Sequence, residues 1–177
     1  MAHKQQQGFT LIEISTVLSV LAATVATAIG GFGSLIQKLH TEGVAAELAA
    51  DLQFVRTEAV SRNRGVRITF DADDTGARCY VIHTGAAADC SCDGSGMAAC
   101  SNGAIEIKTV AFPNDGRTRV QANVSSMFYD PLRGTVSPAA TLQVIAADGR
   151  QLRHVVNILG RVRTCSAVGN WASFRPC

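Results

Sequence analysis

The first apolar stretch of the chain is long and nearly free of charge. It begins at Phe9, after a short polar stretch, and no charged residue occurs from Ile14 to Ile36. A helix needs about 20 apolar residues to cross the hydrocarbon core of a bilayer. The pattern therefore predicts a membrane-spanning helix over residues 9–36. Glu13 lies near the beginning of this stretch, and a carboxylate in such a position needs a partner.

The helical pattern continues beyond this stretch with a different character. Apolar side chains recur at spacings of three and four residues, at Val44, Leu48, Leu52, Val55 and Ala59. Such spacing predicts an amphipathic helix with one apolar stripe. We expect the stripe to pack against a sheet and the helix to end at residues 63–65.

After Gly65 the pattern changes to the alternation of β-strands. Strands are expected over residues 66–70, 79–83, 105–112, 118–124, 141–146, 152–158 and 161–165. Residues 73–76 and 148–149 have the composition of hairpin turns, and residues 84–104 are expected to form a loop held by a disulfide. The predicted fold class is α+β. A long N-terminal helix, with a membrane half and an amphipathic half, packs on an antiparallel β-sheet in a single domain of residues 37–177.

The cysteine content adds covalent cross-links to this fold. The six cysteines are Cys79, Cys90, Cys92, Cys100, Cys165 and Cys177. An even number after a membrane segment favours disulfides in an oxidising compartment. A zinc site is the alternative, but one residue separates Cys90 from Cys92, and this spacing fits zinc ligand pairs poorly. We therefore predict disulfides and no metal, and the sequence alone leaves the pairing open.

Charge is distributed unevenly along the chain. The net charge of +2 is too small to indicate a nucleic-acid binder by itself. No acidic residue follows Asp148, however, while five arginines do: Arg150, Arg153, Arg161, Arg163 and Arg175. This asymmetry predicts a local basic face in the C-terminal part of the domain.

The chain carries no pattern typical of an enzyme. Nucleophile-elbow, phosphate-loop and zinc-protease motifs are absent from the sequence. The four histidines are scattered, and a catalytic cysteine needs a free thiol, which an oxidising compartment disfavours. We predict no enzymatic activity, no cofactor and no small-molecule substrate.

The sequence Gly8-Phe9-Thr10-Leu11-Ile12-Glu13 separates three interpretations of the N-terminal segment. A secretory signal peptide would have a shorter apolar run, and a plain anchor would give Glu13 no role. The motif resembles the class III signal sequence of type IV pilins and type II secretion pseudopilins. The resemblance implies that prepilin peptidase removes residues 1–8 as a leader by cutting after Gly8. It also implies N-methylation of Phe9 and pairing of Glu13 with the N-terminal amine of a neighbouring subunit.

A second resemblance covers most of the remaining chain. The stretch from Ala45 to Arg62, followed directly by strands, resembles the FimT/GspH branch of the pilin superfamily. It implies a single-pass protein of the bacterial inner membrane with a periplasmic C-terminal domain. The protein would be incorporated into a pilus or pseudopilus with other pilin subunits as partners.

The most specific candidate site is Gly160-Arg161-Val162-Arg163. Residues two apart on a strand face the same way, so Arg161 and Arg163 are expected to project together. Their guanidinium groups suit phosphate oxygens, and Gly160 would either admit a phosphodiester backbone or form a turn. The simpler interpretation is a solvated strand face.

The C-terminal tail adds aromatic side chains to this candidate site. A Cys165–Cys177 bond would close a loop presenting Trp171, Phe174 and Arg175, and aromatic rings beside cations are typical of single-strand binding. The alternative is that Trp171 and Phe174 form a small core. FimT-type minor pilins that capture DNA carry Gly-Arg-Xaa-Arg near the C-terminus, and this resemblance implies DNA as a partner of Gly160, Arg161 and Arg163, with Arg150, Arg153 and Arg175 nearby. The alternative function is a purely structural minor pilin or H-type pseudopilin that primes or caps a filament.

Overall fold

The computed structural model describes residues 8–73, 76–93, 95–112, 116–169, 171 and 173–177, with the backbone alone for residues 27–31 and 73. The chain divides into two compact units, Met1–Ile36 and Gln37–Cys177. The predicted leader lies outside the described residues except for Gly8, as do residues 74 and 75 of the first predicted turn.

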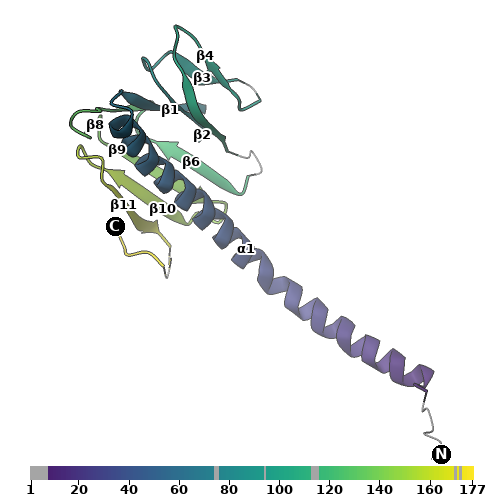
Figure 1. The fold of residues 1–177 in the computed structure, drawn as a ribbon. Helices are drawn as coiled ribbons and strands as arrows, with labels where there is room; N and C mark the ends of the chain where they lie inside the picture. Colours follow the sequence, from purple (N-terminus) through teal and green to yellow (C-terminus); the bar gives the residue numbers. More distant parts are fainter. Residues whose placement is uncertain (1–7, 74–75, 94, 113–115, 170, 172) are drawn as a thin grey trace, which may run out of the picture. The chain divides into compact units, whose positions relative to one another are not determined.

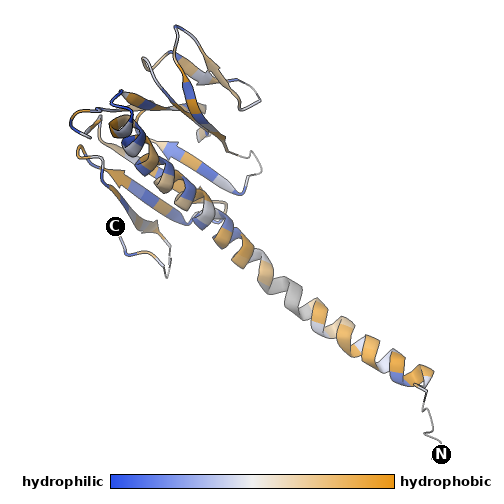
Figure 2. Cartoon of the chain, in the orientation of Figure 1, coloured by the Kyte–Doolittle hydropathy of each residue, from blue (hydrophilic) through white to orange (hydrophobic). Residues whose placement is uncertain are grey.

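The first unit consists of the N-terminal part of helix α1 (Leu11–Ser61) and the residues before it. Thr10 caps the helix, because its carbonyl oxygen accepts a hydrogen bond from the Glu13 amide at 3.1 Å and its hydroxyl lies 3.4 Å from the same amide. Large apolar side chains such as Leu11, Ile12 and Val20 are exposed around this part of the helix, and most of the residues that Figure 2 colours there are hydrophobic. Among the described residues, no helix combines the length and apolarity of a membrane span.

In the second unit, residues 37–61 of α1 lie across one face of the sheet (Figure 1). The predicted stripe is confirmed: Leu48, Leu52, Val55 and Ala59 are all 0% exposed. The helix ends as expected. The Arg64 amide donates to the Ala59 carbonyl oxygen at 3.1 Å, and Asn63 adopts a left-handed conformation with φ of 47°. Asparagine tolerates this region better than most residues, which makes it a suitable helix terminator.

The sheet is antiparallel throughout, which confirms the predicted fold class. Its strands are β1 (Val66–Asp73), β2 (Gly76–His83), β5 (Glu106–Ala111), β6 (Thr118–Ala122), β7 (Ser126–Tyr129), β8 (Val136–Ser137), β9 (Ala140–Ala146), β10 (Gln151–Val156) and β11 (Val162–Val168). The spatial order is β11-β10-β9-β6-β2-β1-β7-β8, and β5 pairs with β2 beside β6. Strand β11 therefore lies at one end of this order.

The strands differ from the predictions in several places. Residues 84–104 are not all loop, because β3 (Cys90–Cys92) and β4 (Ala98–Cys100) pair as a separate small sheet. The Cys90–Cys100 disulfide holds these two strands together at directly opposed positions. Strands β7 and β8 were not expected at all, and the predicted strand over residues 161–165 extends to Val168.

The disulfide pairing is now defined. The three bonds are Cys79–Cys92, Cys90–Cys100 and Cys165–Cys177, and no cysteine is free. The first joins β2 to β3, and the second joins β3 to β4. The third joins β11 to the C-terminal residue.

One hydrophobic core lies between α1 and the sheet. It includes Leu48 and Leu52 from the helix, Leu142 and Leu152 from the sheet, and Trp171 from the C-terminal tail. Every residue of this core belongs to Gln37–Cys177. The second unit therefore contains a complete core of its own, which is the requirement for folding without the first 36 residues.

Candidate nucleic-acid interface

Arg163 lies on β11, and Arg161 is the residue just before this strand. Both side chains are exposed. The residues that alternate with them point the other way: Val162 packs against the main core, and the Thr164 hydroxyl lies 2.8 Å from Nδ1 of buried His154. Neither arginine forms an ion pair with any of the described residues. Both guanidinium groups are thus available to a ligand.

Gly160 forms a tight turn before these arginines. Its φ of 69° lies in the left-handed region, and its amide donates to the Asn157 carbonyl oxygen at 2.8 Å. The side-chain Oδ1 of Asn157 accepts from the amides of Leu159 and Arg161 at 3.1 and 3.0 Å. A Cβ atom at Gly160 would lie 3.0 Å from Cδ of Arg56. The structure therefore favours the turn for Gly160 over close approach of a phosphodiester, because the glycine is buried.

Strand pairing extends the basic surface from β11 across the sheet. Arg163 lies opposite Val155, and Arg153 lies opposite Cys165, so Arg153 and Arg163 share one face as diagonal neighbours. The next strands add Arg119, because Arg119 pairs with Ile145 and Ile145 pairs with Gln151. We call Arg119, Arg153, Arg161 and Arg163 the arginine face.

The arginine face runs diagonally over β11, β10 and β6. Strands lie about 4.8 Å apart and rise about 3.4 Å per residue. The backbone positions are therefore separated by roughly 7 Å from Arg161 to Arg163, roughly 8 Å from Arg163 to Arg153, and roughly 12 Å from Arg153 to Arg119. No acidic residue occurs in β6, β9, β10 or β11, so no carboxylate of these strands neutralises the face. Gln121 and Gln143 lie opposite each other on the same side and offer amide donors.

Sequence reasoning missed Arg119, although it alternates with buried Thr118 and Val120 on a predicted strand. That alternation was the available signal for its outward direction. Arg153 is half-buried, and its Nε atom is buried without a hydrogen-bond partner among the described residues.

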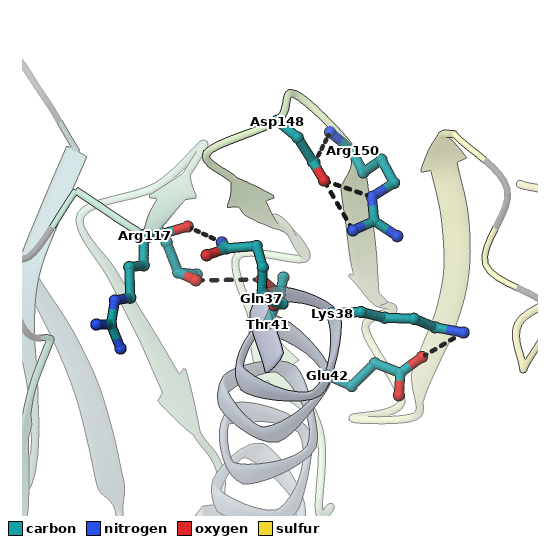
Figure 3. Close-up of polar contacts among 8 residues, drawn as sticks. Gln37, Lys38, Thr41, Glu42, Arg117, Asp148 and Arg150 are labelled. Atoms are coloured by element: carbon teal, nitrogen blue, oxygen red, sulfur yellow. Dashed lines mark hydrogen bonds and ion pairs between the residues drawn. The ribbon is translucent and has the colours of Figure 1, made fainter. Parts of the chain in front are cut away.

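Arg150 is engaged elsewhere. Its Nε and one terminal nitrogen lie 2.8 and 2.7 Å from Oδ2 of Asp148, as Figure 3 shows. Its guanidinium carbon also lies 4.8 Å from the centre of the Trp171 ring. These contacts hold Arg150 at the β9–β10 turn. The hydrogen bonds from the Arg150 side chain and backbone lower the pKa of the Asp148 carboxyl.

The C-terminal tail does not present Trp171 to solvent, and the ring packs in the main core rather than in a small core of its own. Trp171 is 1% exposed and belongs to the main core, against which Phe174 packs. The tail returns along β11, where the Ser166 amide donates to the Arg175 carbonyl oxygen at 2.8 Å and the Cys177 amide donates to the Ser166 carbonyl oxygen at 3.0 Å. Arg175 is exposed beside this strand, so it borders the arginine face without lying on a paired strand.

The N-terminal motif is exposed in the first unit. Gly8 and Phe9 precede the helix, and Phe9 is 80% exposed. Glu13 lies in the first turn of α1, where a carboxylate interacts favourably with the helix dipole. Thr10 and Glu13 also have the spacing of a capping box, which is a local role for this carboxylate beside the pairing that the resemblance implies.

Two polar clusters in the second unit are structural in character. Asp51 accepts hydrogen bonds from the Tyr80 hydroxyl at 2.5 Å and from the Lys108 ammonium at 2.6 Å, and both Asp51 and Tyr80 are buried. Burial, together with the hydrogen bond to Asp51, raises the pKa of Tyr80. Asp71 lies close to Cys79 and Cys92, but both sulfurs are in a disulfide, so this group offers one carboxylate and no thiolate.

Comparison with known proteins gives consistent results. A family model described as type II transport protein GspH matches residues 44–160. Two crystal structures of the type IV minor pilin FimU from Pseudomonas aeruginosa match with TM-scores of 0.53 and 0.51. Both are 20% identical to this chain and cover 70% of it, and the match covers 87% and 90% of their own chains. The minor pseudopilin EpsH from the type 2 secretion system of Vibrio cholerae matches with a TM-score of 0.50, 13% identity and coverage of 71% of this chain and 96% of its own.

At these identities, the structural matches show the fold alone. A search of curated proteins found no match to the sequence. The family match ends at Gly160, so it does not include Arg161 or Arg163.

Proposed function

The chain belongs to the GspH family of type II transport proteins, and we propose that it is a minor pilin of a type IV pilus that binds DNA through the arginine face. The observation that carries this proposal is the row of outward-facing arginines on strands that contain no acidic residue. Arginine binds phosphate oxygens in a planar, bidentate manner. A surface of this kind, carried outside the cell by a filament, would hold DNA for uptake in natural transformation.

Binding would occur through the phosphate backbone rather than the bases. The Trp171 ring is 1% exposed and cannot stack on a nucleotide base. Phosphate contacts position a nucleic acid without reading its sequence. We therefore expect weak binding, with a Kd of roughly 1–100 μM at physiological salt, and similar affinity for duplexes of any sequence.

The direct test is substitution of the two exposed arginines of the motif. Arg161→Ala combined with Arg163→Ala is expected to weaken binding at least tenfold at low salt, because two phosphate contacts are lost. The slope of log K against log salt concentration should fall by about 2, since each contact releases about one counterion. Fluorescence anisotropy with a labelled duplex and the Gln37–Cys177 unit measures both quantities.

A matched control removes the same charge elsewhere. Arg62→Ala combined with Arg64→Ala lowers the net charge equally at the end of α1 and should change the salt slope little. Arg119→Ala should lower the slope by about 1 if the face extends to β6. Unchanged binding in the Arg161/Arg163 variant would refute the assignment of the motif, and no binding by the unmodified unit at low salt would refute DNA binding altogether.

The proposal includes processing at the N-terminus. Prepilin peptidase would remove residues 1–8 after Gly8, Phe9 would become the methylated N-terminus, and Glu13 would pair with the amine of a neighbouring subunit. Residues 9–36 would anchor the chain in the inner membrane and later form the filament core, with residues 37–177 as the periplasmic domain. The exposed apolar side chains of the first unit support this role, because filament neighbours or lipid would cover them.

A purely structural subunit is the second candidate. It is favoured by the family match, which covers residues 44–61 of α1 and most of the sheet but stops before Arg161. In this case the chain would prime or cap a pilus or a secretion pseudopilus through protein contacts. The DNA-binding measurement separates the two candidates, because only the first requires affinity for a polyanion.

A further inference from the structure

Two turns and the end of α1 expose large aliphatic side chains at one end of the second unit. Leu132 is 84% exposed in the turn between β7 and β8, and Ile158 and Leu159 are 64% and 50% exposed in the turn between β10 and β11. Val60 of α1 is 51% exposed. We call these four residues the tip patch. Large exposed apolar patches on soluble domains mark interaction sites.

The two turns and the end of α1 that carry the tip patch contact one another. The Val136 amide donates to the Ile158 carbonyl oxygen at 2.9 Å. A Cβ at Gly160 would lie 3.2 Å from the Gly134 carbonyl oxygen, and a Cβ at Gly134 would lie 3.8 Å from Val60. Arg56 lies beneath both turns and donates from Nε to the Gly134 carbonyl oxygen at 3.1 Å.

Each turn is also held from within. Asp130 Oδ1 accepts from the amides of Leu132 and Arg133 at 2.8 and 3.0 Å, which lowers the pKa of this carboxyl. Asn157 Oδ1 organises the other turn in the same way. The aliphatic side chains therefore stand on a preformed surface, and a partner would not have to order it.

The charges beside the tip patch indicate the chemistry of its partner. Arg133 and Arg161 are exposed directly beside Leu132 and the second turn, and neither forms an ion pair among the described residues. A complementary surface would combine a place for an aliphatic side chain with a carboxylate at its rim.

The chain itself carries such a surface on its other strands. One surface hollow is lined by Gly96, Met97, Ala98, Glu106, Thr109 and Ala111. Met97 is 65% exposed, and Glu106 is exposed with Ile105, 51% exposed, beside it. Glu106 is the one carboxylate among these lining residues, and no lysine or arginine lies among them. We call this the acidic hollow.

We propose that the tip patch of one molecule docks in the acidic hollow of a second copy. Leu132 enters the hollow against Met97, and Arg133 pairs with Glu106 at its rim. The two surfaces differ, so the contact is heterologous and joins copies into an open series rather than a closed dimer. This inference does not rest on DNA binding.

The test is a charge exchange followed by sedimentation velocity on the Gln37–Cys177 unit, without DNA. The unmodified unit should associate in a concentration-dependent manner that weakens with salt. Arg133→Glu alone and Glu106→Arg alone should each weaken association at least tenfold, because like charges then meet. An equimolar mixture of the two variants should restore association, because both contacts become complementary again.

Controls separate this contact from other causes. Arg119→Glu makes the same charge change on the arginine face and should leave association unchanged, whereas Leu132→Ser should abolish it. A unit that stays monomeric up to about 1 mM at low salt, or a mixture that fails to associate, overturns the proposal. A monomeric unit that binds phosphatidylglycerol vesicles through Leu132 also overturns it, by assigning the tip patch to an anionic lipid surface.

Discussion

Replacing Trp171 by alanine is expected to lower the free energy of unfolding of the second unit by about 3–5 kcal/mol. The ring is 1% exposed within the main core, so truncation leaves a large cavity between the tail and the body of the unit. It also removes the surface on which the Arg150 guanidinium lies. Urea unfolding of the Gln37–Cys177 unit, followed by circular dichroism, measures the loss.

The control for this prediction is Val168→Ala. Val168 is 50% exposed on β11, and its truncation should change stability by no more than about 0.5 kcal/mol. The opposite interpretation of Trp171, as a platform for nucleotide bases, makes a different prediction: affinity for single-stranded DNA would fall while stability stayed the same. That outcome would contradict the buried position of the ring.

Trp171 also illustrates where sequence reasoning ends. The sequence offered two interpretations of the tail, and nothing local distinguishes a ring that folds inward from one that faces solvent. The distinction depends on the return of the tail along β11, where Ser166 pairs with Pro176 and Cys165 bonds to Cys177. These contacts join residues that no short-range pattern connects.

Elements with a visible period were predicted, and elements without one were missed. Leu48 and Leu52 follow the helical repeat, which is a local property of the chain. In β7, by contrast, Ser126, Met127 and Tyr129 are all buried and Phe128 is half-buried. Because both faces of β7 are covered, its sequence shows no alternation. Strand β8 has only two residues, which is too short for any pattern.

Three members of the arginine face, Arg153, Arg161 and Arg163, were candidates from the sequence, and Arg119 was not. Arg161 and Arg163 are two residues apart, so their shared direction follows from the strand period. Arg119 joins them through the pairing of β6 with β9 and of β9 with β10. That register is set by the core between α1 and the sheet, so the sequence could show that Arg119 faces outward but not which residues lie beside it.

Acid should destabilise the second unit through His154. It is 0% exposed on the core side of β10, and its Nδ1 lies 2.8 Å from the Thr164 hydroxyl. Burial lowers its pKa to about 4, with the backbone of Ala45 acting in the opposite direction. The imidazole is therefore neutral in the folded state at neutral pH, and protonation would place a charge in the core.

Lowering the pH from 7 to 4 is expected to reduce the free energy of unfolding by about 3 kcal/mol through His154. Between pH 6.5, where the histidine of the unfolded chain titrates, and about 4, the unfolded chain binds a proton that the folded unit does not. The stabilisation is thus complete above pH 6.5 and is lost as the pH falls toward 4. Urea titrations at intervals across this range measure the change.

His154→Gln isolates this contribution, because glutamine retains a polar group for Thr164 and does not titrate. Buried His83, whose pKa is also lowered by burial, and the exposed carboxyls contribute equally to both proteins, so they cancel in the difference between the two pH profiles. The unmodified unit should lose about 3 kcal/mol more than the variant between pH 7 and 4. Parallel profiles would mean that His154 accepts its proton without penalty in the folded state, which a side chain with 0% exposure and no carboxylate partner among the described residues should not do.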